Sequence, residues 1–193
     1  MKIGIDFDGV ILDSERGCNF YADYWSTFSL NKERKRSDST MQEGCFDWTD
    51  EEIDYFYNNF YDDITKKSPF IVGAKEILTK LKEEGHELYV ITLRGLYREQ
   101  EQIDAQNKLD ELGVKFDGIF WSQRNKVELC KELGISVMID DGEYNVEKFV
   151  NQDITVLYFK ESQIREINAP NVRTVHSWMD IYRQIQELSK GEK

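Results

Sequence analysis

Two aspartates close the first apolar run of the chain, and their spacing suits phosphoryl transfer. The run reads Ile3-Gly-Ile-Asp-Phe-Asp-Gly-Val10 and places Asp6 and Asp8 two positions apart. Because side chains at i and i+2 of an extended segment share a face, both carboxylates can reach one small volume. One carboxylate can attack phosphorus, while the other protonates the departing oxygen and then activates water. The pair therefore predicts catalysis through an aspartyl-phosphate.

The glycine after this pair allows a sharp turn in which the backbone N–H groups of Phe7 and Gly9 can hold phosphate oxygens. The same Asp-x-Asp-Gly pattern opens calcium loops, which carry a glutamate at the twelfth position. Here that position, counted from Asp6, is Gly17, and residues 10–12 are apolar. From this segment alone, a catalytic pair and a simple turn at a strand end both stay open.

The composition indicates a globular protein with one sizeable core. Of the 193 residues, 40% are hydrophobic and 32% are charged, and no apolar run is long enough to span a membrane. No basic and then apolar leader opens the chain, so we expect a cytoplasmic protein without a membrane partner. Cys18, Cys45 and Cys130 lack paired spacing, and we expect reduced, mostly buried thiols rather than disulfides or a zinc site.

The net charge of −12 disfavours binding to nucleic acid polymers or anionic membranes. The one dense basic stretch runs from Lys32 to Arg36, and a solvated loop is the favoured interpretation over a polyanion site. The two histidines, His86 and His176, lie far apart in the sequence, which argues against a histidine metal site or a Ser-His relay.

Strand and helix signals alternate from Pro69 onward, and this alternation predicts an α/β fold. Right-handed crossovers then give a Rossmann-like parallel sheet with helices on both faces. Apolar and β-branched runs predict strands at residues 2–6, 87–91, 118–121, 137–139, 154–159 and 172–175. Helices are predicted between the strands, including one over residues 97–112, and Gly85, Gly113 and Gly134 are the expected stops.

Residues 14–68 carry helical signals and are expected to form a separate lobe inserted after the first strand. An aromatic-rich helix comes first, and a second helix is predicted to begin at Thr49 or Asp50. A polar stretch from Asn31 to Gly44 connects them. The predicted domains are therefore an α/β core of residues 1–13 and 69–193 and a small helical cap of residues 14–68.

Chemically complementary side chains follow successive strands of the predicted sheet. The first strand ends in Asp6, the second in Thr92, the fourth in Asp140 and Asp141, and Lys126 lies a few residues beyond the third. Because ligands bind beyond the carboxyl ends of parallel strands, these side chains are expected to converge. Asn125 and Asn145 are interpreted as helix-start residues rather than substrate ligands.

Four carboxylates in one pocket need cations to balance them. An unscreened pair of like charges at ~4 Å costs about 4 kcal/mol at an effective dielectric of 20. Lys126 supplies one positive charge, and Mg²⁺, which prefers oxygen ligands, would supply two more. The sequence therefore predicts a magnesium site beside the lysine.

At this point the chain resembles the haloacid dehalogenase superfamily of phosphatases, whose four motifs match in order. They are Asp-Phe-Asp-Gly-Val at residues 6–10, the apolar run ending in Thr92, Lys126 at a helix start, and Ile-Asp-Asp at residues 139–141. Residues 3–10, 73–94 and 126–141 look most similar to the 5'(3')-deoxyribonucleotidase group and its bacterial relatives. The inserted lobe resembles the helical cap found after the first motif in one class of the superfamily.

The resemblance implies a role for each matching residue. Asp6 would be the nucleophile and Asp8 the general acid and base, Thr92 would bond the phosphoryl group, and Lys126 would balance its charge. Arg94 departs from the residues usual at its place and could contact phosphate or pair with a carboxylate.

The resemblance also implies the magnesium ligands. They would be an oxygen of Asp6, the carbonyl of Asp8 and Asp141, with Asp140 acting through water or as an orienting group. Which aspartate of the Asp140-Asp141 pair binds directly stays open.

The expected substrate is a nucleoside monophosphate, cleaved by a monomer or homodimer under a cap that reads the base. Twelve of the 25 aromatic residues fall in the cap, and the candidates for stacking on the base are Phe20, Tyr21, Phe46 and Trp48. Ser14 stands where the nucleotidase group tends to have an aromatic residue. Another small ester, such as a sugar phosphate, and a non-catalytic binding module are the alternatives.

Overall fold

The computed structural model describes residues 1–35, 42–160 and 166–191. Its contacts divide the chain into two compact units. An α/β unit joins Met1–Ile11 to Phe70–Lys193, and a helical cap unit comprises Leu12–Pro69. The boundaries expected from the sequence fall one or two residues from these limits.

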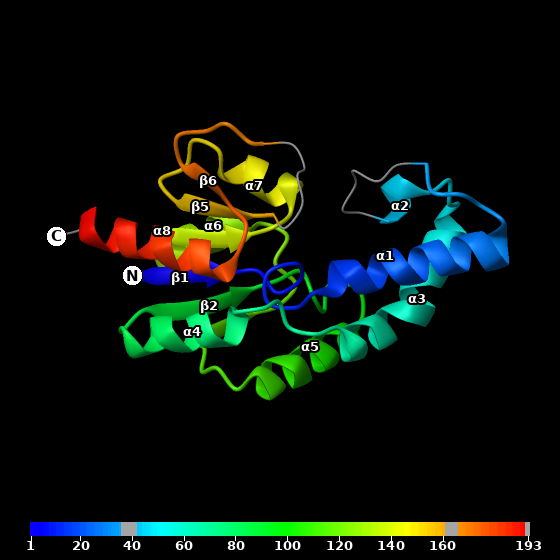
Figure 1. Ribbon diagram of the computed structural model, residues 1–193, viewed down its shortest axis with the longest axis horizontal. Helices are drawn as coiled ribbons and strands as arrows, with labels where there is room; N and C mark the ends of the chain where they lie inside the picture. The colour runs from blue at the N-terminus through cyan, green and yellow to red at the C-terminus, as the bar shows by residue number, and fades with distance from the viewer. Residues whose placement is uncertain (36–41, 161–165, 192–193) are drawn as a thin grey trace. The chain divides into compact units, whose positions relative to one another are not determined.

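The described strands of the α/β unit form one six-stranded sheet in the order β3-β2-β1-β4-β5-β6, and every neighbouring pair is parallel (Figure 1). The strands are β1 (Lys2–Ile5), β2 (Glu87–Ile91), β3 (Gly118–Phe120), β4 (Val137–Asp140), β5 (Thr155–Phe159) and β6 (Val172–Val175). Because β1 lies between β2 and β4, the chain reverses its direction across the sheet beside β1, which is where open α/β sheets bind ligands.

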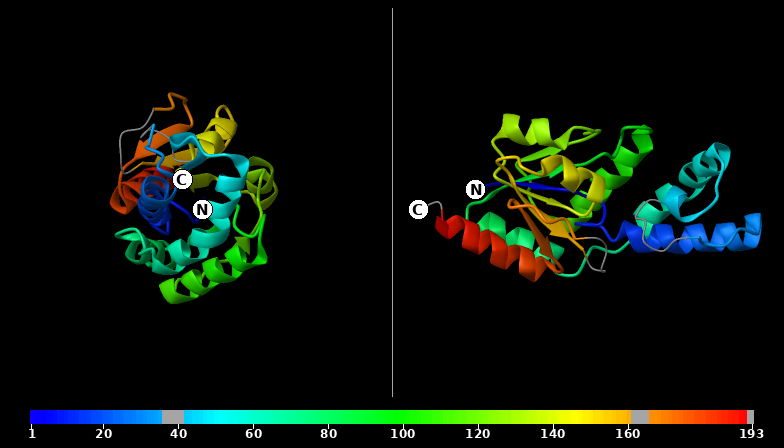
Figure 2. Two further views of the ribbon diagram at one scale, coloured as in Figure 1. Left: turned by 90° about the vertical axis from the view of Figure 1, so that its right-hand side faces the viewer. Right: turned by 90° about the horizontal axis from the view of Figure 1, so that it is seen from above.

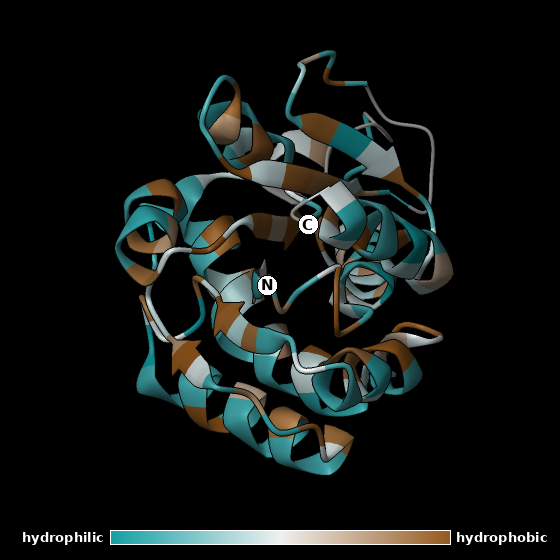
Figure 3. Cartoon of the chain, turned by 90° about the vertical axis from the view of Figure 1, so that its left-hand side faces the viewer, coloured by the Kyte–Doolittle hydropathy of each residue, from teal (hydrophilic) through white to brown (hydrophobic). Residues whose placement is uncertain are grey.

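Helices cover both faces of this sheet, which confirms the predicted fold class. They are α4 (Ala74–Glu83), α5 (Glu99–Leu112), α6 (Lys126–Leu133), α7 (Glu143–Phe149) and α8 (Trp178–Gly191). Figure 2 shows α4 and α8 on one face and α6 and α7 on the other. In Figure 3 the strands carry mostly hydrophobic residues, whereas the helices mix both kinds, as expected where only one side of each helix faces the sheet.

The core beneath α6 and α7 is built from residues of these two helices and alternate residues of three strands, β2, β4 and β5. It contains Tyr89, Ile91, Cys130, Ile135, Met138, Val146, Phe149, Ile154, Val156 and Tyr158. Strands buried on both faces need continuous apolar runs, and Leu88 to Ile91 and Val137 to Ile139 are such runs.

Two element limits differ from the sequence-based expectation for local reasons. The helix expected from residue 97 begins at Glu99, because Arg98 has an extended backbone with φ −143° and ψ 135°. The first strand ends at Ile5 rather than Asp6, where the chain enters a turn closed by a bond from Ile11 N to Phe7 O of 2.9 Å.

The cap unit packs its two long helices around aromatic side chains. It comprises α1 (Ser14–Trp25), the π-helical turn η1 (Ser26–Leu30), α2 (Gln42–Cys45) and α3 (Asp50–Lys67), and its fully covered residues are Ala22, Trp25, Cys45, Phe46, Phe56 and Ile64. Thr49 caps α3, since its hydroxyl accepts from Glu52 N at 3.3 Å and Glu52 Oε2 accepts from Thr49 N at 2.7 Å.

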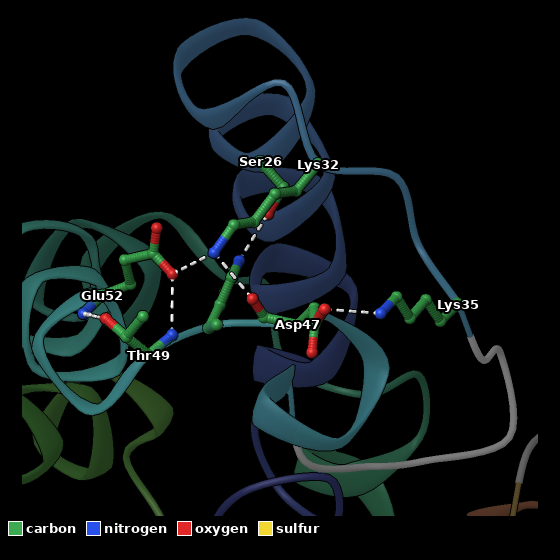
Figure 4. Close-up of polar contacts among 7 residues, drawn as sticks. Ser26, Lys32, Lys35, Asp47, Thr49 and Glu52 are labelled. Carbon is green, nitrogen blue, oxygen red and sulfur yellow. Dashed lines mark hydrogen bonds and ion pairs between the residues drawn. The ribbon is translucent and has the colours of Figure 1, made fainter.

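The basic stretch is held by ion pairs inside the cap unit, as Figure 4 shows for two of its lysines. Lys32 Nζ donates to Glu52 Oε2 at 2.5 Å and to the carbonyl of Asp47 at 2.6 Å, and Lys35 Nζ donates to Asp47 Oδ2 at 2.6 Å. Arg34 pairs with Asp23 at 2.8 Å. Lys32 and Lys35 thus tie the segment after η1 to the start of α3 and the residues just before it, and Arg34 ties the same segment to α1. Arg36 lies outside the described residues.

The three cysteines are free thiols, and Cys45 and Cys130 are buried, while Cys18 is half-buried. None of the helices in the described part of the chain combines the length and apolar character that a membrane span needs.

Candidate active site

Neighbouring strand ends bring Asp6 and Asp140 together. Asp6 directly follows β1 and Asp140 ends β4, and a bond of 2.9 Å from Asp6 N to Ile139 O continues the pairing of the two strands. Asp6 is 8% exposed and Asp140 is completely buried. The predicted convergence at the carboxyl edge of the sheet is therefore present in the α/β unit.

Lys126 joins these two carboxylates. Its Nζ lies 2.8 Å from Asp6 Oδ2 and 2.8 Å from Asp140 Oδ2, and its side chain is 3% exposed. The lysine is the first residue of α6, where Asn125 is the N-cap and accepts from Glu128 N at 3.5 Å. The helix start thus delivers a buried cation between two buried anions.

Burial raises the pKa of Asp6 to about 7; the Lys126 ammonium opposes this rise, and the Asp140 carboxylate adds to it. Burial works against the charge of Lys126, but the carboxylates of Asp140 and Asp6 outweigh it and raise the pKa of the lysine above its usual range. Lys126 is therefore a permanent cation, whereas an additional cation would favour the ionised form of Asp6.

Both oxygens of Asp140 have partners in the protein. Oδ2 faces Lys126, while Oδ1 accepts from Gly142 N at 2.9 Å and from the side chain of Asn145 at 3.2 Å. Asn145 lies inside α7 and serves this aspartate, a role that the sequence reasoning did not assign to it. Asn145 lies five residues after Asp140, across the loop from β4 to α7, and this spacing matches no motif that could have marked it.

Asp141 lies against Gly9, in the loop that follows β1. A Cβ built on Gly9 would lie 2.0 Å from Asp141 Oδ2, and Gly9 has a positive φ of 65°. Only glycine fits this backbone and this approach. The sequence motif therefore needs its glycine at least as much for room beside Asp141 as for N–H groups directed at phosphate.

Three carboxylates form a cluster suited to a cation. Asp6, Asp140 and Asp141 each offer one oxygen, and these atoms lie within 4.8 Å of one another. An all-oxygen, anionic donor set is what Mg²⁺ prefers. The residues present thus fit the predicted metal.

Arg94 donates two parallel hydrogen bonds to the carboxylate of Asp8. Its Nε lies 2.7 Å from Asp8 Oδ2 and its Nη2 lies 2.5 Å from Asp8 Oδ1, and the arginine is 3% exposed. Of the two roles left open for Arg94, pairing with a carboxylate is the one found here. A forked pair of this kind also fixes the plane of the carboxylate.

Thr92 lies at the end of β2 and is 1% exposed. Its hydroxyl accepts from Arg94 N at 3.2 Å, so it shapes the turn that carries the arginine. Glu101 supports the same turn, because it accepts from Gly95 N and Arg98 Nε at 3.3 Å each. Sequence reasoning missed Glu101, which looks like an ordinary charged residue on a helix.

Two further contacts hold the nucleophile loop. Phe7 N donates to Asp6 Oδ1 at 2.7 Å, so this N–H, expected to face phosphate, is engaged by the Asp6 carboxylate. Trp178 Nε1 donates to the carbonyl of Val10 at 2.9 Å, and this tryptophan is 1% exposed. The last helix thereby anchors the first loop, a contact between residues too distant in sequence to be read from a motif.

The aromatic candidates of the cap unit lie in different surroundings. Phe46 is 5% exposed and its ring stacks on Trp48, with centroids 4.9 Å apart. Tyr21 packs against Phe60, with centroids 5.7 Å apart. Phe20 is 63% exposed. Contact with a base stays a prediction for all four.

Replacing Gly9 with alanine should lower the free energy of unfolding more than the same change at Gly85. Both glycines have positive φ, 65° and 86°, so each alanine costs about 1–2 kcal/mol of backbone strain. Only at Gly9 does the methyl group meet a carboxylate, since no described atom lies within 4 Å of it at Gly85. Chemical denaturation measures both losses, and equal losses would contradict the close approach of Asp141.

Comparisons with known proteins agree with this geometry. A Bacillus cereus protein described as "Putative nucleotidase" is 27% identical over 192 residues, which cover 94% of this chain and 96% of that protein. Two solved structures share the fold, each with a TM-score of 0.67, covering 96% of this chain and 98% of the other. They are a haloacid dehalogenase-like hydrolase from Streptococcus pneumoniae, 16% identical, and a "predicted phosphatase" from Clostridium acetobutylicum, 21% identical.

The sequence model of one family matches residues 1–190, almost the whole chain. With the predicted motifs gathered at one sheet edge and the shared fold, this match establishes the kind of enzyme. The chain belongs to the family described as 5' nucleotidase, deoxy (pyrimidine), cytosolic type C protein, and it is a phosphoric monoester hydrolase of the haloacid dehalogenase superfamily.

Proposed function

We propose that the protein is a cytoplasmic, magnesium-dependent phosphatase of nucleoside monophosphates that works through an aspartyl-phosphate on Asp6. The observation that carries this proposal is the buried group of Asp6, Lys126 and Asp140, with Asp141 beside it. The family description supports the nucleotide and the cytosolic location.

In the first step an oxygen of Asp6 attacks phosphorus, and the bond from phosphorus to the substrate's alkoxy oxygen breaks. Asp8 gives its proton to that oxygen, so the alcohol leaves neutral. In the second step Asp8 takes a proton from water as the water oxygen attacks the same phosphorus. The bond to Asp6 breaks, and inorganic phosphate leaves with Asp6 regenerated.

Arg94 bears on both steps, because Asp8 cannot donate a proton while both its oxygens face the guanidinium. A phosphoryl group with two negative charges would compete with Asp8 for Arg94. Substrate binding would thereby release Asp8 toward the leaving oxygen and give Arg94 a phosphate to hold, together with Thr92 and Lys126. Both roles considered for Arg94 are then used in turn.

The residues that would hold Mg²⁺ are Asp6, the carbonyl of Asp8, and Asp141. Asp140, which Lys126, Gly142 and Asn145 hold in place, would orient the site, and Asp141, which lies against Gly9, would bind the ion directly. When bound, the ion would neutralise charge on the phosphoryl oxygens and favour the ionised nucleophile.

Asp6→Asn should lower kcat by a factor on the order of 10³ or more, because the amide cannot form the phosphoenzyme. The asparagine has nearly the same shape, so the circular dichroism spectrum and cooperative melting should be kept. Steady-state phosphate release measures the loss. A variant that kept a tenth of the activity would rule out a covalent step on Asp6.

Removal of the metal with EDTA should abolish phosphatase activity, and added Mg²⁺ should restore it. Lys126 alone does not balance the negative charge of the carboxylate cluster. The same dialysed sample without EDTA serves as the control. Full turnover in metal-free buffer would refute the magnesium assignment.

A substrate panel tests the class of ester. Nucleoside 5'- and 3'-monophosphates should be hydrolysed with a higher kcat/KM than ribose 5-phosphate or glucose 6-phosphate, since nucleoside 5'-monophosphates and ribose 5-phosphate carry the same primary ester and differ by the base. Equal, weak turnover of every compound would favour a general phosphatase of small esters.

A further inference from the structure

Two tyrosines of the α/β unit are exposed, each with a cation above its ring. Tyr97, in the loop after β2, and Tyr144, on α7, are both 72% exposed. The guanidinium carbon of Arg124 lies 5.8 Å from the centroid of Tyr97, and Lys148 Nζ lies 3.9 Å from that of Tyr144. A cation held over an aromatic ring restrains both side chains.

The two pairs form one continuous row, because Lys148 Nζ also donates to the carbonyl of Arg124 at 3.4 Å. Among the described residues, neither Arg124 nor Lys148 forms a salt bridge with a carboxylate. We call Tyr97, Arg124, Lys148 and Tyr144 the tyrosine row.

The tyrosine row is built on the loops that carry the catalytic residues. Gln123 N donates to Thr92 O at 2.9 Å and Ser122 N donates to Arg94 O at 3.0 Å, so the segment holding Arg124 is bonded to the turn after β2. Arg124 precedes Lys126 by two residues, and Tyr144 follows Asp141 by three. The row therefore borders the phosphate-transfer site within the same unit.

Its chemistry suits an aromatic ligand with negative charge. Single exposed aromatic residues are common on protein surfaces, but two flat rings joined through two cations without carboxylate partners offer both stacking area and positive charge. A nucleobase attached to a phosphorylated sugar has both complementary features. A sugar phosphate has the charge but no ring to stack.

We propose that Tyr97 and Tyr144 form a stacking surface for the base of the substrate, held and made positive by Arg124 and Lys148. The proposal rests on the proposed function, since it names how a nucleoside monophosphate is told apart from other esters. It places a recognition surface on the α/β unit, in addition to the aromatic residues expected to act from the cap unit.

The test compares two sets of variants. The first set is Tyr97→Ala, Tyr144→Ala and the variant that carries both alanines, and the second set is Tyr97→Phe and Tyr144→Phe. Because stacking contributes to ligand binding, the alanine variants should raise KM for a nucleoside monophosphate roughly tenfold, with kcat changed little. The phenylalanine variants should retain the wild-type KM. For ribose 5-phosphate, which lacks the base, KM should stay unchanged in every variant.

Tyr182→Ala is the matched control, because this tyrosine lies on α8 and its hydroxyl donates to Glu84 rather than facing the tyrosine row. Melting temperatures establish that the loops still fold. An unchanged nucleotide KM in the double alanine variant would overturn the stacking surface while leaving the proposed function in place. An equal rise for ribose 5-phosphate would also overturn it. If the wild-type protein does not hydrolyse nucleotides, the proposed function is contradicted, and this inference with it.

Discussion

The bridge that Lys126 makes between Asp6 and Asp140 is the interaction on which the catalytic edge depends. Two buried carboxylates at neighbouring strand ends repel each other, and the lysine offsets that repulsion at 2.8 Å from each. If the lysine is lost, the two carboxylates stay buried without a cation between them, which costs far more than a surface pair would contribute. The ends of β1 and β4 and the start of α6 must therefore be positioned together.

Around this bridge, each side chain that we propose to be catalytic or to orient the site is held by a further partner. Asn145 and Gly142 orient Asp140, Arg94 clamps Asp8, and Trp178 anchors the loop through Val10. Such partners fix the groups before the substrate arrives, so little reorganisation is left for the reaction itself. The close approach of Asp141 to Gly9 has a similar effect, because it packs the loop backbone against the acidic cluster.

The cap unit follows a different physical rule. It is too small to build a core from aliphatic residues alone, so rings such as Trp25, Phe46 and Phe56 supply most of its buried area. Arg34, Lys35 and Lys32 of its basic stretch form internal ion pairs, with Asp23, Asp47 and Glu52 respectively. The high aromatic content of the cap is thus explained largely by folding.

The sequence by itself determined the α/β class and the order of the strands along the chain, and it singled out Asp6, Asp8, Thr92, Lys126 and the Asp140-Asp141 pair as candidate site residues. These follow from local periodicity and from side chains placed directly after apolar runs. Only the tertiary structure decided that Arg94 faces Asp8, that both oxygens of Asp140 are taken, and that Trp178 reaches Val10. Such contacts join residues far apart in the chain, and no local pattern encodes which of several possible partners a side chain meets once the sheet is assembled.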